Sequence, residues 1–317
     1  MKVLVTGGTG FVGSHSVRAL LAAGHDVRVL LRRPRPVPEG AEIVEGDATD
    51  ADAVAVAIKG CDAVLNCVSM VSLNKRAADE VRRVNVKSAE VVLGQAVDAG
   101  LDPIIHVSSV SALLPPDGDS VLTPDSPVGN PPGAYMQSKA DADRYARGLQ
   151  ESGAPVVLTY PTMVVGPDDP TMGEGMATIA RVVRGRVPAL PPGGMEIIDV
   201  RDIAAAHVAA MTPGRGPRRF FLSGHHRSAR ALVAELRQIT GRRLPVARVP
   251  TALAAAACRV GDLLPVDLPL TTEGLWLLTL DPRSDDSATR GELGVVPRSL
   301  AETLRDTVDW LRTSGRI

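Results

Sequence analysis

The N-terminal stretch MKVLVTGGTGFVG, residues 1–13, decides the fold class. A short apolar segment runs into glycines at positions 7, 10 and 13, spaced G-x-x-G-x-x-G, and a helical pattern follows. Such glycines permit a sharp turn, close approach of a diphosphate and tight packing of helix on strand, while the free N–H groups of the helix bind phosphate. The stretch predicts a dinucleotide-binding turn, and the residues expected against the cofactor are Gly7, Gly10, Phe11, Val12 and Gly13.

Strand and helix signals alternate through the first half of the chain, which is typical of a parallel, doubly wound α/β sheet. After residue 161 helical segments predominate, with short strands near 196–200 and 219–222. The other expected strands are residues 3–5, 27–31, 43–44, 63–65, 104–107 and 156–160, and the main helices are 11–23, 77–99 and 135–150.

These patterns predict an α/β fold with a Rossmann-type sheet and a smaller, mostly helical C-terminal region that binds substrate. We expect residues 1–160 to form the NAD(P)-binding domain, with 196–215 returning to it. Residues 161–195 and 216–317 then form the substrate-binding region.

Composition excludes several classes of protein. The chain has 317 residues with 35 basic and 36 acidic side chains, so no global basic excess favours a nucleic acid as partner. Three cysteines lack metal-ligand spacing, and no metal is expected. The chain begins in a strand, without the pattern of a secretory signal, and a cytoplasmic location is expected.

No apolar run reaches the ~18 residues of a membrane span. The longest candidate is TALAAAAC, residues 251–258, which predicts a helix that is packed or lies against something apolar.

The end of the second strand bears on the choice of cofactor. An NAD-preferring fold normally carries an acid there for the ribose 2′-hydroxyl, whereas this chain has Arg32 and Arg33. Arginine pairs with a 2′-phosphate, so the sequence favours NADP(H), with NAD(H) as the alternative.

Further cofactor contacts are expected beyond the ends of later strands. Asp47 follows the third strand and can accept from the adenine amino group, and Asn66 begins the N-C-V-S turn after the fourth. The neighbouring positions expected to contribute are Ala48, Val68 and Val107.

Tyr135 and Lys139 form a Y-x-x-x-K pair, which places both side chains on one face of a helix. A nearby ammonium is expected to lower the pKa of tyrosine and to make it a usable acid or base. Ser109 closes the fifth strand, where a hydroxyl can bind a substrate oxygen, and Ser111 is the alternative.

Residues 114–133 are dense in Pro, Gly, Asp and Ser and predict a long loop beside the site. Substrate is expected between the sheet edge, this loop and the segments after residue 161. The apolar residues of those segments favour a partly apolar substrate, and they are Met163, Met172, Met176, Met195, Leu263, Leu264 and Trp276.

Taken together, these motifs resemble the extended short-chain dehydrogenase/reductase family, also called the NAD-dependent epimerase/dehydratase family. The resemblance covers nearly the whole chain, and its C-terminal half is similar to the dihydroflavonol 4-reductase-like branch. The matching motifs, in order, are TGGTGFVG, EGD at 45–47, VNV with Asn85, VSS at 107–109, YMQSK at 135–139, YPTMVVGP at 160–167, DVRDIAAAH at 199–207, ELG at 292–294 and VDWL at 308–311.

The resemblance implies an NADPH-dependent carbonyl reductase. Tyr135 would protonate the new alkoxide, and Lys139 would bind the nicotinamide ribose and tune the tyrosine. Asn85 would belong to the cofactor site, with Pro161 and Thr162 near the nicotinamide. The family often dimerises through two long helices, which here correspond to residues 77–99 and 135–150.

The chain departs from the family pattern at several positions. Tyr160 stands where arginine is common, and Leu113-Leu114 replaces a Tyr-Gly pair. Val110 and Ser111 stand where a hexose dehydratase carries an acidic pair, so elimination lacks its acid and base.

Two alternatives remain. One is a sugar-nucleotide epimerase with tightly held NAD, whose diphosphate site would draw on Arg181, Arg184, Arg186 or Arg215. The other is a non-catalytic NADP(H) sensor or scaffold, against which the intact Ser109, Tyr135 and Lys139 argue.

Overall fold

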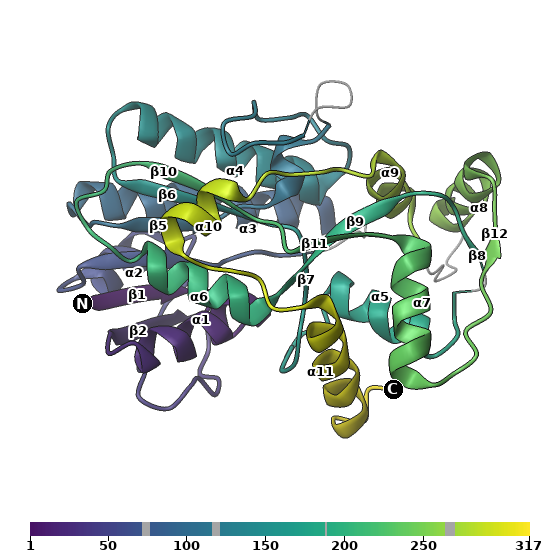
Figure 1. The fold of residues 1–317 in the computed structure, drawn as a ribbon. Coiled ribbons are helices and arrows are strands. Elements are labelled where there is room, and N and C mark those ends of the chain that lie inside the picture. Colours follow the sequence, from purple (N-terminus) through teal and green to yellow (C-terminus); the bar gives the residue numbers. More distant parts are fainter. Residues whose placement is uncertain (72–76, 116–120, 188, 264–269) are drawn as a thin grey trace.

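The computed structural model describes residues 1–71, 77–115, 121–187, 189–263 and 270–317. Within them a seven-stranded parallel sheet has the order β3-β2-β1-β4-β5-β6-β10, which confirms the predicted Rossmann-type architecture (Figure 1). Its strands are β1 (Lys2–Thr6), β2 (Asp26–Leu31), β3 (Glu42–Glu45), β4 (Ala63–Asn66), β5 (Ile104–Val107), β6 (Val156–Pro161) and β10 (Arg218–Leu222).

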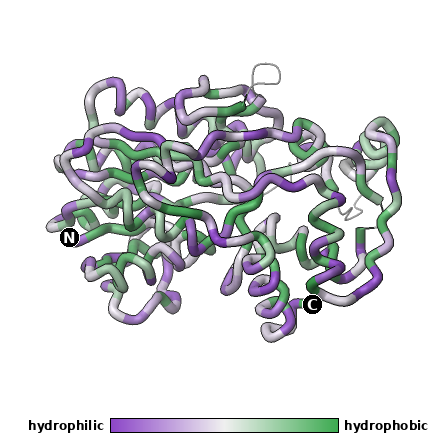
Figure 2. The backbone as a smooth tube through the Cα atoms, in the orientation of Figure 1, coloured by the Kyte–Doolittle hydropathy of each residue, from purple (hydrophilic) through white to green (hydrophobic). Residues whose placement is uncertain are grey.

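Helices cover both faces of this sheet, and alternate strand residues serve the two faces. Leu4 packs in a core with α2, α3 and α4, whereas Val3 and Val5 pack in a second core with α1 and α6. Hydrophobic stretches accordingly gather in the central strands (Figure 2). The helices are α1 (Phe11–Ala22), α2 (Ala51–Ile58), α3 (Ala78–Asp98), α4 (Ala134–Glu151) and α6 (Val200–Ala210).

Helix α2 was not expected from the sequence. Its Ala/Val alternation resembles a strand, so its start is marked only by Asp50, whose carboxylate accepts from the N–H groups of Asp52 and Ala53 at 2.9 and 3.3 Å. The predicted strand and helix positions elsewhere in the first half are confirmed within one or two residues.

The later part of the chain forms a smaller lobe around two short sheets. β9 (Gly194–Asp199) pairs with β7 (Met163–Val165) and β11 (His225–Ser228), and β8 (Ala189–Leu190) pairs with β12 (Ala247–Arg248). Its helices are α5 (Glu174–Val183), α7 (Ala229–Thr240), α8 (Thr251–Leu263), α9 (Thr272–Leu280), α10 (Ser287–Leu293) and α11 (Leu300–Thr313). The division of the chain at residues 160, 195 and 215 stays a prediction.

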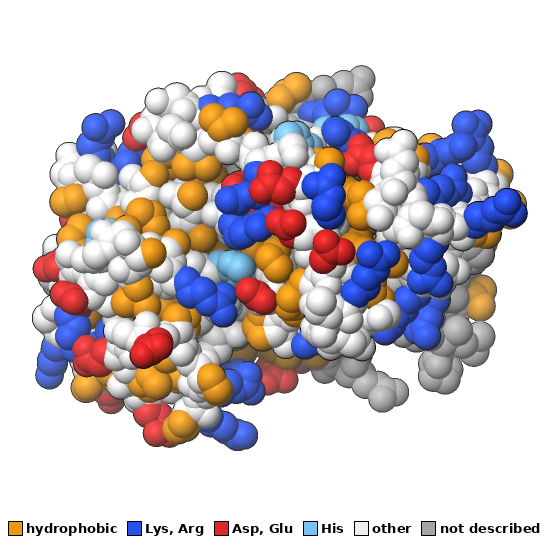
Figure 3. All heavy atoms as spheres, turned by 60° about the horizontal axis from the view of Figure 1, so that its bottom comes forward, with side chains coloured by type: hydrophobic (Ala, Val, Ile, Leu, Met, Phe, Trp, Pro, Cys, Tyr) orange, Lys and Arg blue, Asp and Glu red, His pale blue; other side chains and the backbone are white. Residues whose placement is uncertain are grey.

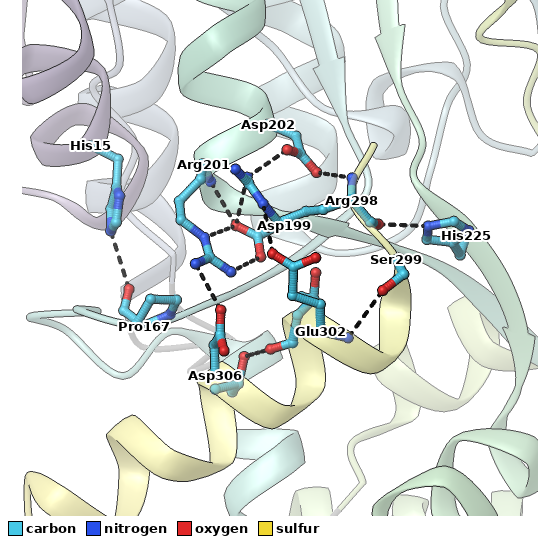
Figure 4. A network of polar contacts seen from close by, with 12 residues as sticks. His15, Pro167, Asp199, Arg201, Asp202, His225, Arg298, Ser299, Glu302 and Asp306 are labelled. Atoms are coloured by element: carbon cyan, nitrogen blue, oxygen red, sulfur yellow. Dashed lines mark hydrogen bonds and ion pairs between the residues drawn. The ribbon is translucent and has the colours of Figure 1, made fainter. Parts of the chain in front are cut away.

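A buried ionic network ties α11 to the start of α6 (Figure 4). Asp199 caps α6 and accepts from the backbone, Nε and Nη2 of Arg201 at 2.7–2.9 Å. Arg201 Nη1 also lies 2.8 Å from Asp306 on α11, while Arg298 Nη1 lies 2.5 Å from Asp202. Burial would raise the pKa of Asp199, but the hydrogen bonds from Arg201 lower it. This network fixes the smaller lobe against the sheet.

None of the helices in the described part of the chain combines the length and the apolar composition that a bilayer span requires.

Substitution of Asp199→Asn should lower the free energy of unfolding by about 1.5–3 kcal/mol, because the hydrogen bonds from Arg201 lose their charged acceptor while Arg201 keeps Asp306 at 2.8 Å. Chemical denaturation measures this difference. Asp309→Asn removes an exposed partner 3.5 Å from Arg312 and should cost less than ~1 kcal/mol. Equal losses of unfolding free energy in Asp199→Asn and Asp309→Asn would show that the Asp199–Arg201–Asp306 network does not stabilise the contact of α11 with α6.

Candidate active site

The turn after β1 leaves no room for side chains at two of its glycines. Gly7 has φ of +71°, and a Cβ there would lie 2.6 Å from the carbonyl oxygen of Cys67. A Cβ at Gly13 would lie 2.2 Å from the Gly7 oxygen. The turn and the close helix–strand packing inferred from the sequence are therefore present.

Helix α1 begins at this turn with its N-terminus open. Gly10 is the N-cap and no side chain caps the helix, so the first N–H groups have no acceptor within the helix. Gly10, Phe11, Val12 and Gly13 line one end of a cavity of about 1140 Å³. Unpaired amides at a helix N-terminus suit a bound diphosphate.

Arg32 and Arg33 leave the sheet at the same edge, because β2 pairs in parallel with β1 and Leu30 lies opposite Thr6. Both side chains are exposed, and neither forms an ion pair with any residue that the structure describes. The two guanidinium groups are thus available to a phosphate near the turn.

Asp47 and Ala48 follow β3, which pairs in parallel with β2, so they lie at the same edge of the sheet as Arg32 and Arg33. One Asp47 oxygen accepts from the N–H and the hydroxyl of Thr49, both at 2.9 Å, and Ala48 is buried beneath this turn. The carboxylate is therefore held at the sheet edge by its own turn.

Asn66 lies inside the sheet. Its Oδ1 accepts from the Thr6 hydroxyl at 2.7 Å and from the N–H of Val68 at 3.2 Å, and its Nδ2 lies 3.1 Å from Nδ1 of His106. Asn66 thus shapes the turn after β4, and the residues that follow β4 and line the cavity are Cys67, Ser69 and Val71.

Asn85 joins that same turn to the catalytic helix. Its Oδ1 accepts from the N–H of Met70 at 2.7 Å, and its Nδ2 donates to the Met70 oxygen and to the Ser138 hydroxyl at 3.1 and 2.8 Å. The side chain is almost fully buried and its three contacts are with the protein. Asn85 is placed to position the site from behind.

Tyr135 lies in the first turn of α4 and lines the cavity. Burial raises its pKa, while hydrogen bonds with Ser69 and Ser109 lower it, and the net effect is a rise. The lowering expected from Lys139 is therefore wrong for the protein alone, because desolvation of the phenol outweighs the other contributions. Ser69 escaped the sequence analysis as a partner because an isolated serine in a turn carries no signal.

Ser109 is the serine next to Tyr135. Its Oγ accepts from the N–H and the hydroxyl of Ser111 at 3.2 and 2.9 Å, which leaves its own hydrogen free to donate. Ser111 also lines the cavity, but it is almost fully buried and its hydroxyl is bonded to Ser109. This geometry favours Ser109 over Ser111 as the hydroxyl that meets a substrate.

Lys139 is buried one turn along α4 from Tyr135, and its Nζ donates to the carbonyl of Val107 at 3.2 Å. Burial lowers the pKa of Lys139 to about 8, whereas Cys67 and Asp143 act to raise it. The ammonium form is thus only moderately favoured at neutral pH.

The same face of α4 continues into a buried ion pair. Asp143 accepts from the Ser108 hydroxyl at 2.7 Å and from Arg147 Nε at 2.9 Å, and Arg147 Nη2 donates to the Tyr160 hydroxyl at 2.9 Å. Tyr160, which departs from the family's usual arginine, therefore lies in the core beneath the site. Asp143 was not singled out from the sequence, although it continues the four-residue spacing of Tyr135 and Lys139.

The other end of the cavity is mostly apolar. Pro161 and Thr162 line its middle, and the Thr162 hydroxyl donates to the carbonyl of Ser223 at 2.8 Å. The apolar wall beyond them includes Met163, Val164, Val182, Val187, Leu190, Met195, Leu232, Val233, Leu270, Leu277 and Leu278.

Several expected pocket residues lie elsewhere. Met176 is buried in the core of the smaller lobe, and Met172 and Trp276 pack against hydrophobic cores without lining the cavity themselves. The side chain of Leu263 and all of Leu264 lie outside the described residues. None of the described residues of the 114–133 loop lines the cavity, because Leu122 is buried against Ser284.

Arg181 lines the cavity wall, 3.8 Å from Glu174. The other arginines considered for a diphosphate do not: Arg184 donates to the carbonyl of Arg316, Arg215 lies 3.7 Å from Glu292, and Arg186 is exposed. Among the described residues, no three His, Cys, Asp or Glu side chains form a metal site.

Residues 3–222 match the family model described as "NAD dependent epimerase/dehydratase family". The chain belongs to the NAD-dependent epimerase/dehydratase family. This membership places it among the NAD(P)-dependent oxidoreductases of the extended short-chain dehydrogenase/reductase type.

Three relatives cover almost the whole chain. The first is "Sterol demethylase protein B" of Methylococcus capsulatus, 30% identical over all of both chains. The second is "Putative dihydroflavonol 4-reductase" of Synechocystis, 32% identical over 99% of this chain and 95% of the relative. The third, from Stigmatella aurantiaca, is a farnesyl-dihydroquinoline-oxide ketoreductase, 28% identical over 99% and 97%.

Two solved structures have the same fold over 99% of this chain. The protein gox2253 superposes with a TM-score of 0.83 at 28% identity, over 99% of its own chain. DesIV, a dTDP-glucose 4,6-dehydratase of Streptomyces venezuelae solved with NAD, superposes with a TM-score of 0.78 at 25% identity over 97% of its chain.

We expect Lys139 to titrate near pH 8, and Asp143→Asn to move its pKa lower, because the Asp143 charge favours the ammonium. The ammonium form is present below this pKa and is lost as the pH rises through it. NMR of protein with isotope-labelled lysine follows the titration, since the chain has five lysines.

Asp141→Asn is the matched control, because Asp141 lies on the outer side of α4, 2.8 Å from Arg144. An unchanged Lys139 pKa in Asp143→Asn would rule out this electrostatic role.

Proposed function

We propose that the protein is an NADP(H)-dependent oxidoreductase that interconverts a ketone and a secondary alcohol on a small, partly apolar substrate. The observation that carries this proposal is the position of Tyr135. It lines one continuous cavity between the amides of α1 and an apolar wall, with Ser109 and Ser69 as its partners.

The residues of the turn fit a dinucleotide. A Cβ placed on Gly10 would have one neighbouring atom within 4 Å, the Gly7 oxygen at 3.3 Å. The cavity side of the turn is therefore open. We infer that the amides of Phe11, Val12 and Gly13 receive the diphosphate, and that Arg32 and Arg33 receive a 2′-phosphate. Asp47, Ala48, Val68, Val107, Pro161 and Thr162 would complete the cofactor site, with Asn66 and Asn85 acting as its supports.

The raised pKa of Tyr135 suits the reductive direction. A protonated phenol is the form that can donate a proton to a developing alkoxide. A nicotinamide cofactor, when bound, supplies the hydride to the carbonyl carbon. Ser109 donates a hydrogen bond to the carbonyl oxygen, which stabilises the negative charge that develops there.

Lys139 then stabilises the tyrosinate. Its ammonium lies one helical turn from Tyr135, and its charge opposes that of the phenolate. The Val107 carbonyl holds the ammonium in place, and the Asp143 carboxylate favours its charged form.

The apolar wall favours a ring-containing or lipid-like ketone. Such a substrate gains from burial of its own apolar surface against Met163, Leu190 and Leu232. The relatives' descriptions support the same class, since one is a sterol demethylase protein, one a putative dihydroflavonol reductase and one a ketoreductase of a farnesylated ring.

One observation favours the second candidate, an epimerase that retains NAD and binds a sugar nucleotide. Arg181 lines the cavity and could meet a diphosphate. A single arginine already near Glu174 is a weak diphosphate site, so the reductase is the better-supported function. A homodimer through α3 and α4, which pack side by side in Figure 1, is also part of the proposal.

Arg32→Ala should weaken NADPH binding about 10- to 100-fold and leave NADH binding nearly unchanged, because only the former carries the 2′-phosphate. Cofactor fluorescence measures both affinities. Arg82→Ala, an exposed arginine of α3, is the control. Equal affinities for both cofactors in the wild type, or NAD that co-purifies with the protein, would favour the epimerase.

Tyr135→Phe should reduce NADPH-dependent ketone reduction at least ~100-fold, because the proton donor is lost while the ring is kept. Ser109→Ala should reduce it more than Ser111→Ala, since Ser111 only supports Ser109. Steady-state kinetics on a panel of cyclic and aromatic ketones gives both comparisons. A larger loss in Ser111→Ala would assign the substrate contact to that serine instead.

A further inference from the structure

Helix α8 is apolar on its outer face as well as on its inner face. Its inner residues Ala254 and Cys258 are buried, and Cys258 and Gly261 line the cavity. On the outer face Leu253 and Val260 expose 62% and 55% of their surface, with the exposed Ala256 and Ala257 between them. A surface helix normally turns polar residues, and not a second apolar stripe, toward water. The outer stripe at 253, 256, 257 and 260 has no cover among the residues that the structure describes.

The chain around α8 is basic. Residues 241–263, which include all of α8, contain four arginines and one acid, Asp262, although the whole chain has a net charge of −1. Arg242, Arg243, Arg248 and Arg259 are all exposed, and none pairs with an acid within the described ranges. Figure 3 shows blue side chains gathered at the end of the molecule that carries α7, α8 and β12 in Figure 1.

These elements also form the outer wall of the apolar end of the cavity. Arg248 on β12 pairs with Leu190 on β8, and Leu190 lines the cavity. Cys258 lines it from α8, one residue before the exposed Arg259. Arg248 and Arg259 therefore lie beside residues that line the apolar end of the cavity.

We propose that the outer stripe of α8, with Arg242, Arg243, Arg248 and Arg259, docks on the surface of an anionic lipid bilayer. The apolar stripe enters the boundary between headgroups and acyl chains, and the arginines reach lipid phosphates. An anionic bilayer is the occupant we propose, because it presents negatively charged headgroups directly beside an apolar layer and so matches both the arginines and the apolar stripe. Substrate would pass through the α8 wall from the lipid, and this last step rests on the proposed function.

Co-sedimentation of the full-length protein with phosphatidylcholine vesicles tests the docking, with and without about 30% phosphatidylglycerol. We expect binding at least ~10-fold stronger to the anionic vesicles, and weaker in about 0.5 M salt. The assay needs neither cofactor nor turnover, so its result is independent of the proposed ketone reduction.

Two double variants separate the two parts of the surface. Leu253→Glu with Val260→Glu removes the apolar stripe, and Arg242→Glu with Arg243→Glu reverses part of the charge. Each should lower vesicle binding about tenfold or more while NADPH binding and the circular dichroism spectrum stay unchanged.

Matched controls place the same changes elsewhere. Val56 and Val296 are 58% and 71% exposed, and Arg18 on α1 and Arg305 on α11 are also exposed, so their glutamate variants should bind vesicles like the wild type. The proposal is overturned if the protein binds anionic vesicles no better than neutral ones. It is overturned equally if the control variants lose as much vesicle binding as the α8 variants. It is also overturned if the α8 variants instead dissociate a dimer, since the stripe would then cover a second copy of the chain.

Discussion

The backbone of Gly13 lies so close to the Gly7 carbonyl that a Cβ at position 13 would be 2.2 Å from its oxygen. This contact holds α1 against the turn after β1, with the helix axis directed at the cavity. Gly7 in turn packs against the carbonyl of Cys67, so the turns after β1 and β4 are fixed together. The open amides of α1 and the Ser69 that meets Tyr135 therefore depend on one closely packed pair of turns.

Charged side chains of α4 make a second set of fixed contacts beneath the cavity. Tyr135, Lys139, Asp143 and Arg147 follow one another at four-residue spacing down the buried face of α4. Ser108, next to Ser109, donates to Asp143, so the end of β5 and the helix are joined beneath the site. A buried ion pair such as Asp143–Arg147 contributes little net stability, and its benefit here is the fixed geometry of the two segments that carry the reacting groups.

The smaller lobe combines two contrasting kinds of surface. The Asp199–Arg201–Asp306 network binds α11 to the sheet through charges that satisfy one another (Figure 4). At the far end, α8 has an exposed apolar stripe, and the arginines near it pair with no acid among the residues that the structure describes. The ionic network stabilises the packing of α11 within the protein, whereas the outer face of α8 is left exposed and suits an external partner.

The sequence by itself determined the sheet, the glycine turn and the family, because each depends on local patterns: strand–helix alternation, three spaced glycines, and Y-x-x-x-K on one helical turn. It also placed Ser109 and Ser111 together but left open which of the two hydroxyls lies next to Tyr135. The tertiary structure distinguishes the two, since packing against α4 brings Ser109 to Tyr135 and leaves Ser111 almost fully buried. It likewise showed that Asn85 supports the site from behind, that the described part of the 114–133 loop lies away from the cavity, and that Met176 belongs to a core. These outcomes depend on contacts between distant segments, which local periodicity does not encode.

The rise in the Tyr135 pKa has the same origin, because desolvation is set by everything that surrounds the phenol and not by the lysine four residues away.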